Sequence, residues 1–591
     1  MVSTLVRPAS PNAMPERPAK RVKFDVSVSL QHSERDSASD RGATPPPAES
    51  LFRPHPLQIK PSGNALMNPE RVRNARIHGL GAFAVLPDEL ILDLLTSLDA
   101  ATLFKLQAVS RAFFVFTRSD TTWKHLYLSA SNGELLGWNG DWRRTYWASF
   151  WASGQHLNEM YEDNGDSGRC EDMALPADDI GAPDLCSDVL YQPHLCSTPL
   201  DATFTKATAL NNLKRVNARV LDQGTFAEQY AETSTPVILC SLTDHWPCRD
   251  LQGETSWDLD ALTERFRGTA FRAEAASVPI EVYSRYCSSV ERGSGVVDES
   301  PLYLFDAEFV RRTDGDMGKE YNVPPIFGED LFRVMGQQRP DYRWLIVGPS
   351  RAGSSWHKDP NSTSAWNAVI TGSKGWILFP PDTPPPGIFV SEDEAEVTAP
   401  LSLAEWFANY YDDALKMYGP RARDPTTRGK MIQGVCLAGE VMYIPAGWWH
   451  IVVNLESCVA VTQNFVSETE LPAVLRFMRD RPEQVSGFKL DISQEEADDD
   501  DALAKVDLHA RFVEALEREV PDVLARALAR MQGESCNGHK SSNALREPAA
   551  DSRDSLWTSL RVQKLKDEKP TSASAFSFGF GDDLEMDDIP W

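Results

Sequence analysis

The sequence lacks several features that would assign it to common classes of protein. Its nine cysteines are scattered and form no C-x-x-C pair, so neither a disulfide framework nor a structural zinc site is indicated. No stretch approaches the roughly 18 consecutive apolar residues of a membrane span. The first residues, MVSTLVRPASP, lack the apolar core of a secretory signal. We therefore expect a soluble intracellular protein with reduced thiols.

Basic residues are fewer than acidic ones. The chain has 59 lysines and arginines against 86 aspartates and glutamates, which gives a formal net charge of −27. Direct binding of nucleic acid depends on clustered positive charge, so it is not indicated. An acidic surface favours basic partners instead, including peptides rich in lysine or arginine. A chain of 591 residues is too long for one hydrophobic core, so we expect about two to four domains.

Both ends of the chain have the composition of unfolded segments. Residues 1–80 are rich in proline, serine, arginine and aspartate, with too few periodic apolar residues to offset the entropy of ordering. Within them PAKRVKFD, residues 18–25, resembles a monopartite nuclear import signal and predicts a location in the nucleus, with access to the cytoplasm. Residues 536–591 end in FGFGDDLEMDDIPW and are predicted to be an acidic flexible tail.

Residues 81–130 are predicted to form three short helices. Pro87 suits the start of the first helix, because Asp88 and Glu89 in its first turn complement the helix dipole. Asp99 is the expected cap of the second helix. A segment this short cannot bury all of its apolar side chains internally. A helical hairpin that packs on a neighbouring domain is therefore one interpretation. The helical spacing is carried by Leu90, Ile91, Leu94, Leu95, Leu98, Leu103, Leu106 and Val109.

The same segment resembles the F-box. The pattern is L-P-x-E-[LI], a leucine-rich second helix, V-S-[KR] and then a tryptophan. The matching residues are Leu86, Pro87, Glu89, Leu90, Leu94, Leu95, Val109, Ser110, Arg111 and Trp123. The resemblance implies binding to the Skp-type adaptor of cullin–RING ubiquitin ligases, with the remaining apolar face as the adaptor-binding surface.

The rest of the chain divides into three predicted regions. Residues 131–205 begin with the aromatic tract GWNGDWRRTYWASFWASG, which is expected to extend the helical part before a polar linker. Residues 206–485 contain short runs bounded by glycine and proline without βαβ alternation, such as TPVILCSL and KGWILFPP. These predict a mainly β sandwich or barrel. Residues 486–535 are predicted to be helical, with a packing or dimer stripe that ends at Pro521. The stripe consists of Val506, His509, Val513, Leu516 and Val520.

Two histidines and one aspartate are the candidate metal ligands. His357 and Asp359 stand two apart in SSWHKDPNSTSAWN, and on a strand such residues face the same side. His450 opens another strand-like run in YIPAGWWHIVVNLE. Two histidines and one carboxylate form the facial triad of non-haem iron(II) oxygenases. A polar turn is the alternative for His357 and Asp359 taken alone, and zinc is the rival metal, although no fourth ligand is evident for a structural zinc site.

Lys374 is a candidate binding residue for a carboxylate. Iron(II) oxygenases of this type usually bind 2-oxoglutarate, whose far carboxylate needs a cation. Lys374, in TGSKGWILFPP, stands at the start of the strand after SAWNAVI. An exposed lysine in a hairpin is the alternative when the residue is considered alone.

Residues from about 220 to 485 resemble the Jumonji-C family, in particular its arginine demethylases and lysyl hydroxylases once described as phosphatidylserine receptors. The similar segments include FAEQYAETSTPVILC, SPLYLFD, TSAWNA and AGEVMYIPAGWWHIVVNLESCVAVTQNF, in the same order. The resemblance implies a double-stranded β-helix, a cupin-type jelly roll, that uses Fe(II), 2-oxoglutarate and O₂. It implies that His357, Asp359 and His450 bind iron. It further implies that 2-oxoglutarate is bound by Lys374, Tyr303, Thr462, Asn367 and Ser354.

Three departures from the family pattern concern the substrate more than the reaction. Ser354 replaces a threonine and keeps its hydroxyl, whereas Trp356 replaces a smaller aliphatic residue and is expected to narrow the entrance. An acidic insertion, VSEDEAEVTAPL, follows PPDTPPPGIF.

Two functional hypotheses result from these observations. The first is a dioxygenase that hydroxylates lysine or demethylates N-methyl groups in basic protein segments, such as histone tails or splicing factors, and that the F-box couples to a cullin–RING ligase. The second is a non-catalytic F-box adaptor whose cupin domain recognises a client. An intact triad together with Lys374 favours the enzyme, because a pure binding module would be free to lose one of them.

Overall fold

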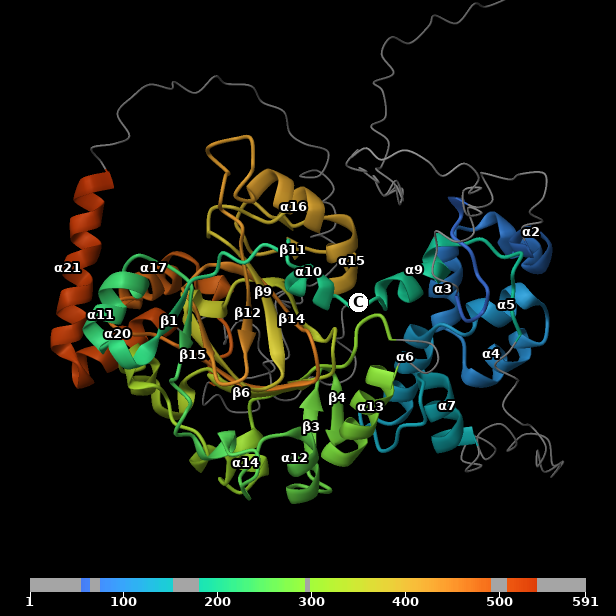
Figure 1. Cartoon of the computed structure of the whole chain (residues 1–591), viewed down its shortest axis with the longest axis horizontal. Coiled ribbons are helices and arrows are strands. Elements are labelled where there is room, and N and C mark those ends of the chain that lie inside the picture. Colours follow the sequence, from blue (N-terminus) through green and yellow to red (C-terminus); the bar gives the residue numbers. More distant parts are fainter. Residues whose placement is uncertain (1–54, 64–74, 152–179, 293–297, 490–506, 539–591) are drawn as a thin grey trace, which may run out of the picture. The chain divides into compact units, whose positions relative to one another are not determined.

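The computed structural model describes residues 55–63, 75–151, 180–292, 298–489 and 507–538 (Figure 1). The basic cluster at residues 18–25, the linker at residues 152–179 and the acidic tail from residue 539 lie outside the described residues. No described helix is long and apolar enough to cross a membrane. The cysteines whose side chains the structure describes are all free thiols, in agreement with the prediction.

The F-box-like segment forms four helices between residues 88 and 130, one more than predicted. Asp99 caps the second, since its carboxylate accepts a hydrogen bond of 2.6 Å from the Thr102 N–H. Ser110 caps the third in the same way, at 3.1 Å from the Phe113 nitrogen. The four are α3 (Asp88–Thr96), α4 (Ala100–Gln107), α5 (Arg111–Phe116) and α6 (Asp120–Ala130).

Only some of the periodically spaced apolar side chains of α3 are buried. Ile91 and Leu95 lie in the core, whereas Leu90 and Leu94 on the same helix are 48% and 46% exposed. Trp123, the last residue of the F-box pattern, is fully buried and its indole N–H donates to the Thr117 carbonyl at 2.8 Å. The helices therefore bury one face and leave a second apolar face in solvent.

Short helices precede and follow these four. The aromatic tract is helical from Trp142 to Trp151, as the sequence predicts, and its rings pack on one another, with Trp138 and Trp142 5.3 Å apart between ring centroids. These helices are α2 (Ala75–Gly79), η2 (Gly81–Val85), α7 (Trp142–Tyr146), the π-helical turn η3 (Trp147–Trp151), α9 (Asp188–Cys196) and α10 (Asp201–Thr205).

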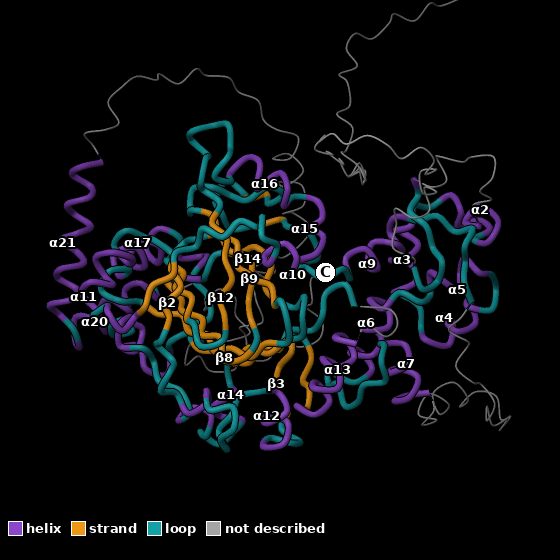
Figure 2. Tube along the Cα trace, in the orientation of Figure 1, coloured by secondary structure: helices purple, strands orange, loops and turns teal. Residues whose placement is uncertain are grey.

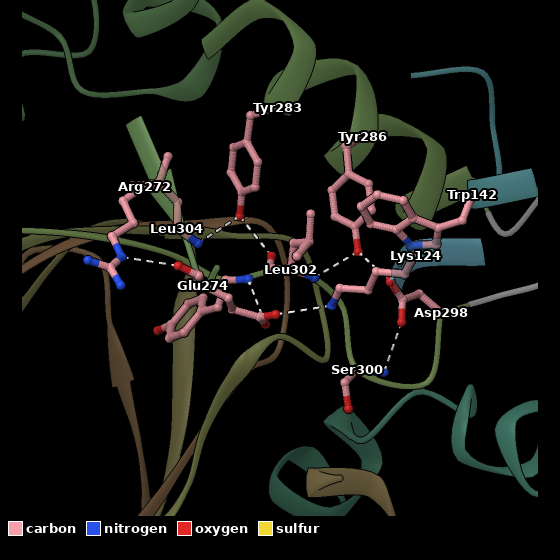
Figure 3. A network of polar contacts seen from close by, with 11 residues as sticks. Lys124, Trp142, Arg272, Glu274, Tyr283, Tyr286, Asp298, Ser300, Leu302 and Leu304 are labelled. Atoms are coloured by element: carbon pink, nitrogen blue, oxygen red, sulfur yellow. Dashed lines mark hydrogen bonds and ion pairs between the residues drawn. The ribbon is translucent and has the colours of Figure 1, made fainter. Parts of the chain in front are cut away.

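Polar contacts join the helical part to the β-rich part (Figure 3). Lys124 on α6 donates to the Glu274 carboxylate at 3.1 Å. The Trp142 indole N–H donates to Asp298 at 3.4 Å, and the Tyr286 hydroxyl donates to the same carboxylate at 3.0 Å. The predicted packing of the helices on a neighbouring domain is therefore present, and it includes buried polar groups.

The strands form two main sheets, which Figure 2 shows gathered together with helices around them. The larger sheet has nine strands in the order β1-β2-β13-β8-β15-β6-β5-β3-β4. Its strands are β1 (Arg215–Asn217), β2 (Val237–Cys240), β3 (Ala270–Ala273), β4 (Ala276–Pro279), β5 (Leu304–Asp306), β6 (Arg343–Gly348), β8 (Ser364–Thr371), β13 (Val441–Ile444) and β15 (Cys458–Phe465).

The smaller sheet has four antiparallel strands in the order β12-β9-β14-β7. They are β7 (Gly353–His357), β9 (Ser373–Phe379), β12 (Ile432–Leu437) and β14 (Trp449–Asn454). Apolar side chains of both sheets meet in one buried cluster, with Val369 and Met442 from the larger sheet and Trp376 and Val452 from the smaller. Two facing sheets of mainly antiparallel strands confirm the predicted jelly-roll class.

A hairpin and several helices complete this part of the chain. The hairpin pairs β10 (Phe389–Val390) with β11 (Val397–Thr398) within the acidic insertion. The longer helices and helical turns are α11 (Gln223–Phe226), η5 (Ala227–Ala231), α12 (Leu259–Arg265), α13 (Ile280–Arg292), α14 (Phe309–Arg312), η9 (Leu331–Gln338), α15 (Leu403–Asn409) and α16 (Tyr411–Tyr418). The short 3-10 turns are η4 (Ala218–Val220), η6 (Pro247–Arg249), η7 (Met317–Lys319), η8 (Pro325–Phe327), η10 (Pro360–Ser362) and η11 (Pro482–Gln484).

The C-terminal helices pack against neighbouring elements through part of the predicted stripe, because Leu516 is buried and Val513 and Val520 pack against the same cluster. Phe512, Ala515 and Leu516 are the buried residues of α20, whereas the predicted His509 and Val513 are only partly buried. The first predicted member, Val506, lies outside the described residues. The helices are α17 (Leu471–Asp480), α20 (Leu508–Glu519) and α21 (Pro521–Gly538), with Pro521 at the predicted break.

Candidate active site

His357, Asp359 and His450 form a cluster that can hold a metal ion. Their potential ligand atoms all lie within 4.8 Å of one another, and no other group of this kind occurs among the described residues. The sheet brings the histidines together, because β7 pairs with β14 in a register that sets His357 opposite His450. The alternation argument placed Asp359 on the same strand as His357, and this is wrong. β7 ends at His357, and Asp359 caps the start of the turn η10.

The close approach of β7 and β14 depends on Gly353. A Cβ atom at this position would collide with the Val452 carbonyl oxygen on β14. Only a residue without a side chain lets the two strands pair as they do. Gly353 therefore sets the spacing that brings His357 and His450 together.

The hydrogen bonds of both histidines define which ring nitrogen can bind a metal. Nδ1 of His357 donates to the Ser355 carbonyl at 2.7 Å, and Nδ1 of His450 donates to the Trp448 carbonyl at 3.0 Å. A carbonyl can only accept, so each Nδ1 carries the proton and each Nε2 keeps its lone pair. Burial lowers the pKa of His357 to about 3, with His450 adding to the effect, and lowers the pKa of His450 to about 4. Both rings are therefore neutral at neutral pH, as a metal ligand must be.

The Asp359 carboxylate is incompletely satisfied by the protein. Asn464 donates to its Oδ1 at 3.2 Å, whereas Oδ2 is buried and has no hydrogen-bond partner among the described residues. Burial raises the pKa of Asp359, although the nearby His357 and the bond from Asn464 oppose the shift. An orphaned carboxylate oxygen beside two neutral imidazoles is costly without a cation. The donor set therefore fits a divalent metal.

Lys374 is a buried cation and not the exposed hairpin lysine of the alternative interpretation. It is 1% exposed, and its Nζ donates to the Tyr303 hydroxyl at 2.5 Å and to Asn454 Oδ1 at 3.0 Å. Burial alone would lower the pKa of Lys374, but Tyr303 and the thiols of Cys458 and Cys436 together raise it. Burial also raises the pKa of Tyr303. A protonated lysine with two neutral partners is a suitable binding group for a carboxylate.

The remaining predicted site residues line the same cavity, two from neighbouring strands of the larger sheet and one from the smaller sheet. Thr462 on β15 stands opposite Asn367 on β8, and its hydroxyl donates to the Trp366 carbonyl at 2.9 Å. The side-chain oxygen of Asn367 is buried without a partner among the described residues. Ser354 on β7 also lines this cavity.

One cavity of about 780 Å³ contains the whole constellation, with its walls drawn from both sheets. The candidate metal ligands and the candidate carboxylate-binding residues all line it: His357, Asp359 and His450, and Lys374, Tyr303 and Thr462. Trp356 does not line it, contrary to the expectation that it narrows the entrance. It packs on Phe379 and Trp406 in a separate core, because adjacent strand residues face opposite sides.

Sequence reasoning missed three residues of this region. Asn464 donates to the candidate ligand Asp359, and Asn454 accepts from the cation Lys374. Trp376 lines the cavity with its ring 6.0 Å from that of His450. Asn454 and Asn464 stand within the quoted segments NLE and TQNF, and Trp376 follows Lys374 by two positions. Trp376 could have been predicted, because residues two apart on a strand share a face and Lys374 and Trp376 both lie on β9.

Comparison with known proteins gives two family matches. Residues 344–465 match the JmjC domain, described as a hydroxylase domain. Residues 83–129 match the F-box-like family. The first match spans β6 to β15, which hold the metal cluster and Lys374.

Three relatives illustrate the similarity along the chain. The arginine-specific demethylase JMJ22 of Arabidopsis thaliana is 37% identical over 510 residues, which cover 86% of this chain and 88% of the relative. The lysine-specific demethylase JMJ21 of the same plant is 34% identical over 403 residues, 67% of this chain and 38% of the relative. The bifunctional arginine demethylase and lysyl-hydroxylase psr-1 of Caenorhabditis elegans is 31% identical over 272 residues, 45% of this chain and 64% of the relative.

Proposed function

This chain belongs to the JmjC family, and we propose that it is an Fe(II)- and 2-oxoglutarate-dependent oxygenase that acts on basic segments of other proteins. The reaction is demethylation of an N-methylated side chain or hydroxylation of lysine. Relatives named for arginine demethylation and for lysyl hydroxylation support this range of outcomes.

A single observation carries the proposal: the triad and the buried Lys374 face one cavity. A metal held by only three protein groups keeps coordination positions for a cosubstrate and O₂. A cation that lines the same cavity as the metal cluster suits a ligand with carboxylates at both ends. 2-Oxoglutarate has this chemistry.

Each group of site residues has a separate binding role. His357, Asp359 and His450 hold Fe(II). Lys374, Tyr303 and Thr462 bind the far carboxylate of 2-oxoglutarate, and Asn367 and Ser354 contribute polar groups on the walls beside it. Fe(II) with 2-oxoglutarate and O₂ supplies an oxidant for a C–H bond of the substrate, with succinate and carbon dioxide as co-products. Hydroxylation of a lysine carbon gives a stable alcohol, whereas hydroxylation of an N-methyl carbon releases formaldehyde.

A purely non-catalytic adaptor is the weaker alternative. Such a protein would have no need for neutral imidazoles aligned across two strands or for a buried lysine facing them. Relatives named as 2-oxoglutarate and iron-dependent oxygenases, including JMJD4 of Danio rerio at 23% identity over 282 residues, also favour catalysis.

Purified protein with Fe(II), ascorbate and 2-oxoglutarate is expected to form succinate and to oxidise basic peptides. Peptide arrays carrying lysine, arginine and methylated arginine, read by mass spectrometry, distinguish the outcomes. A gain of one oxygen atom on lysine indicates hydroxylation, and loss of a methyl group indicates demethylation. Absence of 2-oxoglutarate turnover with every peptide would contradict an enzymatic function.

The F-box-like helices present a surface suited to a Skp-type adaptor, and we propose that they bind one. Leu90 and Leu94 on α3 are about half exposed, and further exposed apolar residues lie before and after this helix. These are Phe83, Val85 and Val109, with exposed fractions of 44%, 86% and 64%. Apolar groups that a helical module leaves in solvent are typical of a docking surface.

Replacing Leu90 and Leu94 together by glutamate is expected to abolish co-purification with a Skp-type adaptor. Both side chains are about half exposed, so charge should disrupt the interface without unfolding the helices. Leu251→Glu, at a residue 47% exposed outside this surface, is the matched control and should keep the adaptor. An adaptor retained by the double variant, or never bound by the wild type, would rule out this surface.

Location in the nucleus is proposed from the basic cluster at residues 18–25, which lies outside the described residues. It would bring histone tails and splicing factors within reach as basic substrates. Imaging a fluorescent fusion with and without Lys20, Arg21 and Lys23 tests this location.

A further inference from the structure

Two walls of different origin form the opening of the catalytic cavity. The hairpin β10–β11 contributes lining residues between 390 and 397, and the segment around η11 contributes those between 481 and 486. Glu394 and Glu396 on the first wall and Glu483 on the second are exposed, which marks this end as the opening. Residues of the acidic insertion thus face the cavity that contains the triad.

One carboxylate of the opening ties the two walls together. Arg481 donates to Glu394 at 2.7 Å, and the Lys358 ammonium lies 3.7 Å from the same carboxylate. Gln484 adds a bond of 2.9 Å to the Asp393 carbonyl on the hairpin. The two lining cations of the opening, Lys358 and Arg481, are therefore both engaged by Glu394.

The other two carboxylates of the opening have no such engagement. Glu396 and Glu483 line the cavity from opposite walls, and neither makes an ion pair with any residue that the structure describes. The opening has two cations, Lys358 and Arg481, and three glutamates, so its side chains carry a net charge of −1. A cation that enters from solvent meets carboxylates that no side chain of the described protein neutralises.

The interior beyond the opening also requires a hydrogen-bond donor. Asn367 is 4% exposed, lines the cavity, and its side-chain oxygen has no partner among the described residues. Trp449 also lines the cavity, and the Lys358 ammonium covers its ring at 4.8 Å from the ring centroid. Unpaired carboxylates at the opening, with a free amide oxygen deeper in the same cavity, suit a cation with an apolar stem and several N–H donors. Arginine and lysine side chains have this chemistry.

Building on the proposed function, we propose that Glu396 and Glu483 determine substrate specificity at the opening. They bind the positive charge of the target arginine or lysine, or of basic residues beside it, as the segment enters the cavity. Glu394 acts as a positioning residue, because its contacts with Arg481 and Lys358 hold the hairpin against the second wall.

The test compares two double variants with the same change in net charge. Glu396→Gln with Glu483→Gln is expected to raise KM for a basic peptide by about threefold to tenfold, as for two partly exposed ion pairs. Glu392→Gln with Glu228→Gln is the control, since both residues are exposed and neither lines the cavity. The kcat with the peptide and the KM for 2-oxoglutarate should not change in either variant. Rising ionic strength should narrow the difference in peptide KM between the two double variants, because salt screens charges beyond roughly 8 Å at physiological concentration.

A binding measurement separates this inference from the proposed function. Fluorescence anisotropy with metal-free protein measures affinity for a labelled arginine-rich peptide, a lysine-rich peptide and an acidic counterpart, and needs no turnover. Weaker binding of either basic peptide to the first variant than to the control supports the inference. Equal binding by both variants, or preference for the acidic peptide, overturns it. Absence of oxidation by a wild type that binds the peptide would contradict the proposed function alone.

Discussion

Alanine in place of His357, Asp359 or His450 is expected to abolish iron-dependent 2-oxoglutarate turnover. The three side chains lie within 4.8 Å of one another and supply every protein ligand of the cluster. Even the residues that support metal ligands are worth about tenfold to a hundredfold in metal affinity or activity. Loss of a ligand itself should therefore cost at least that much. Turnover is measured as succinate formed, and metal affinity by titration with Mn²⁺.

The same variants are expected to fold. Asp359 Oδ2 is buried without a partner among the described residues, so removing the carboxylate also removes an unsatisfied group. The melting temperature of metal-free Asp359→Ala should therefore be no lower than that of the wild type. His245→Ala, at an exposed histidine outside the site, is the control for loss of an imidazole. Turnover at the wild-type rate in any of the three ligand variants would refute the assignment of the triad.

Replacing Lys374 by methionine is expected to raise the KM for 2-oxoglutarate by on the order of tenfold to a hundredfold. A charge-assisted hydrogen bond in a closed site contributes about 1.5–3 kcal/mol, which corresponds to that range. Methionine keeps most of the volume of a side chain that is 1% exposed, so the cavity should retain its shape. Initial rates at varied 2-oxoglutarate give the KM.

Metal affinity distinguishes a local effect from a general one. Lys374→Met leaves the triad intact, so binding of Mn²⁺ should match the wild type. Lys416→Met, at an exposed lysine of α16, removes the same charge at the surface and should change neither quantity. If the KM for 2-oxoglutarate were the same in Lys374→Met and in the wild type, Lys374 would have no role in binding the cosubstrate.

The sequence was sufficient for the fold class and for the family. Short strand-like runs and local motifs predicted a jelly roll, and the two facing sheets and the JmjC match confirm it. The candidate ligands could be found because each histidine stands within a long local pattern, SSWHKDP or GWWHIVVNL. Their catalytic roles, like those of Tyr303 and Thr462, remain predictions that the variants above test.

Residues that act through long-range register were harder to predict. Asn454 reaches Lys374 because β14 and β9 pair these two positions, and Asn464 reaches Asp359 across 105 positions of the chain. An asparagine on a strand gives no local sign of such a partner. Trp356 is different, since strand alternation places it on the face opposite His357 and could have excluded it from the entrance.

The position of Gly353 has a consequence for inherited variation. A mutation that adds even a methyl group there would force β7 away from β14 and separate His357 from His450, although every ligand would still be present. Such an allele would behave as a catalytic null while the gene still encoded a complete triad. Interpretation of natural variants by ligand identity alone would therefore class it as harmless, and an assay of metal binding would reveal the defect.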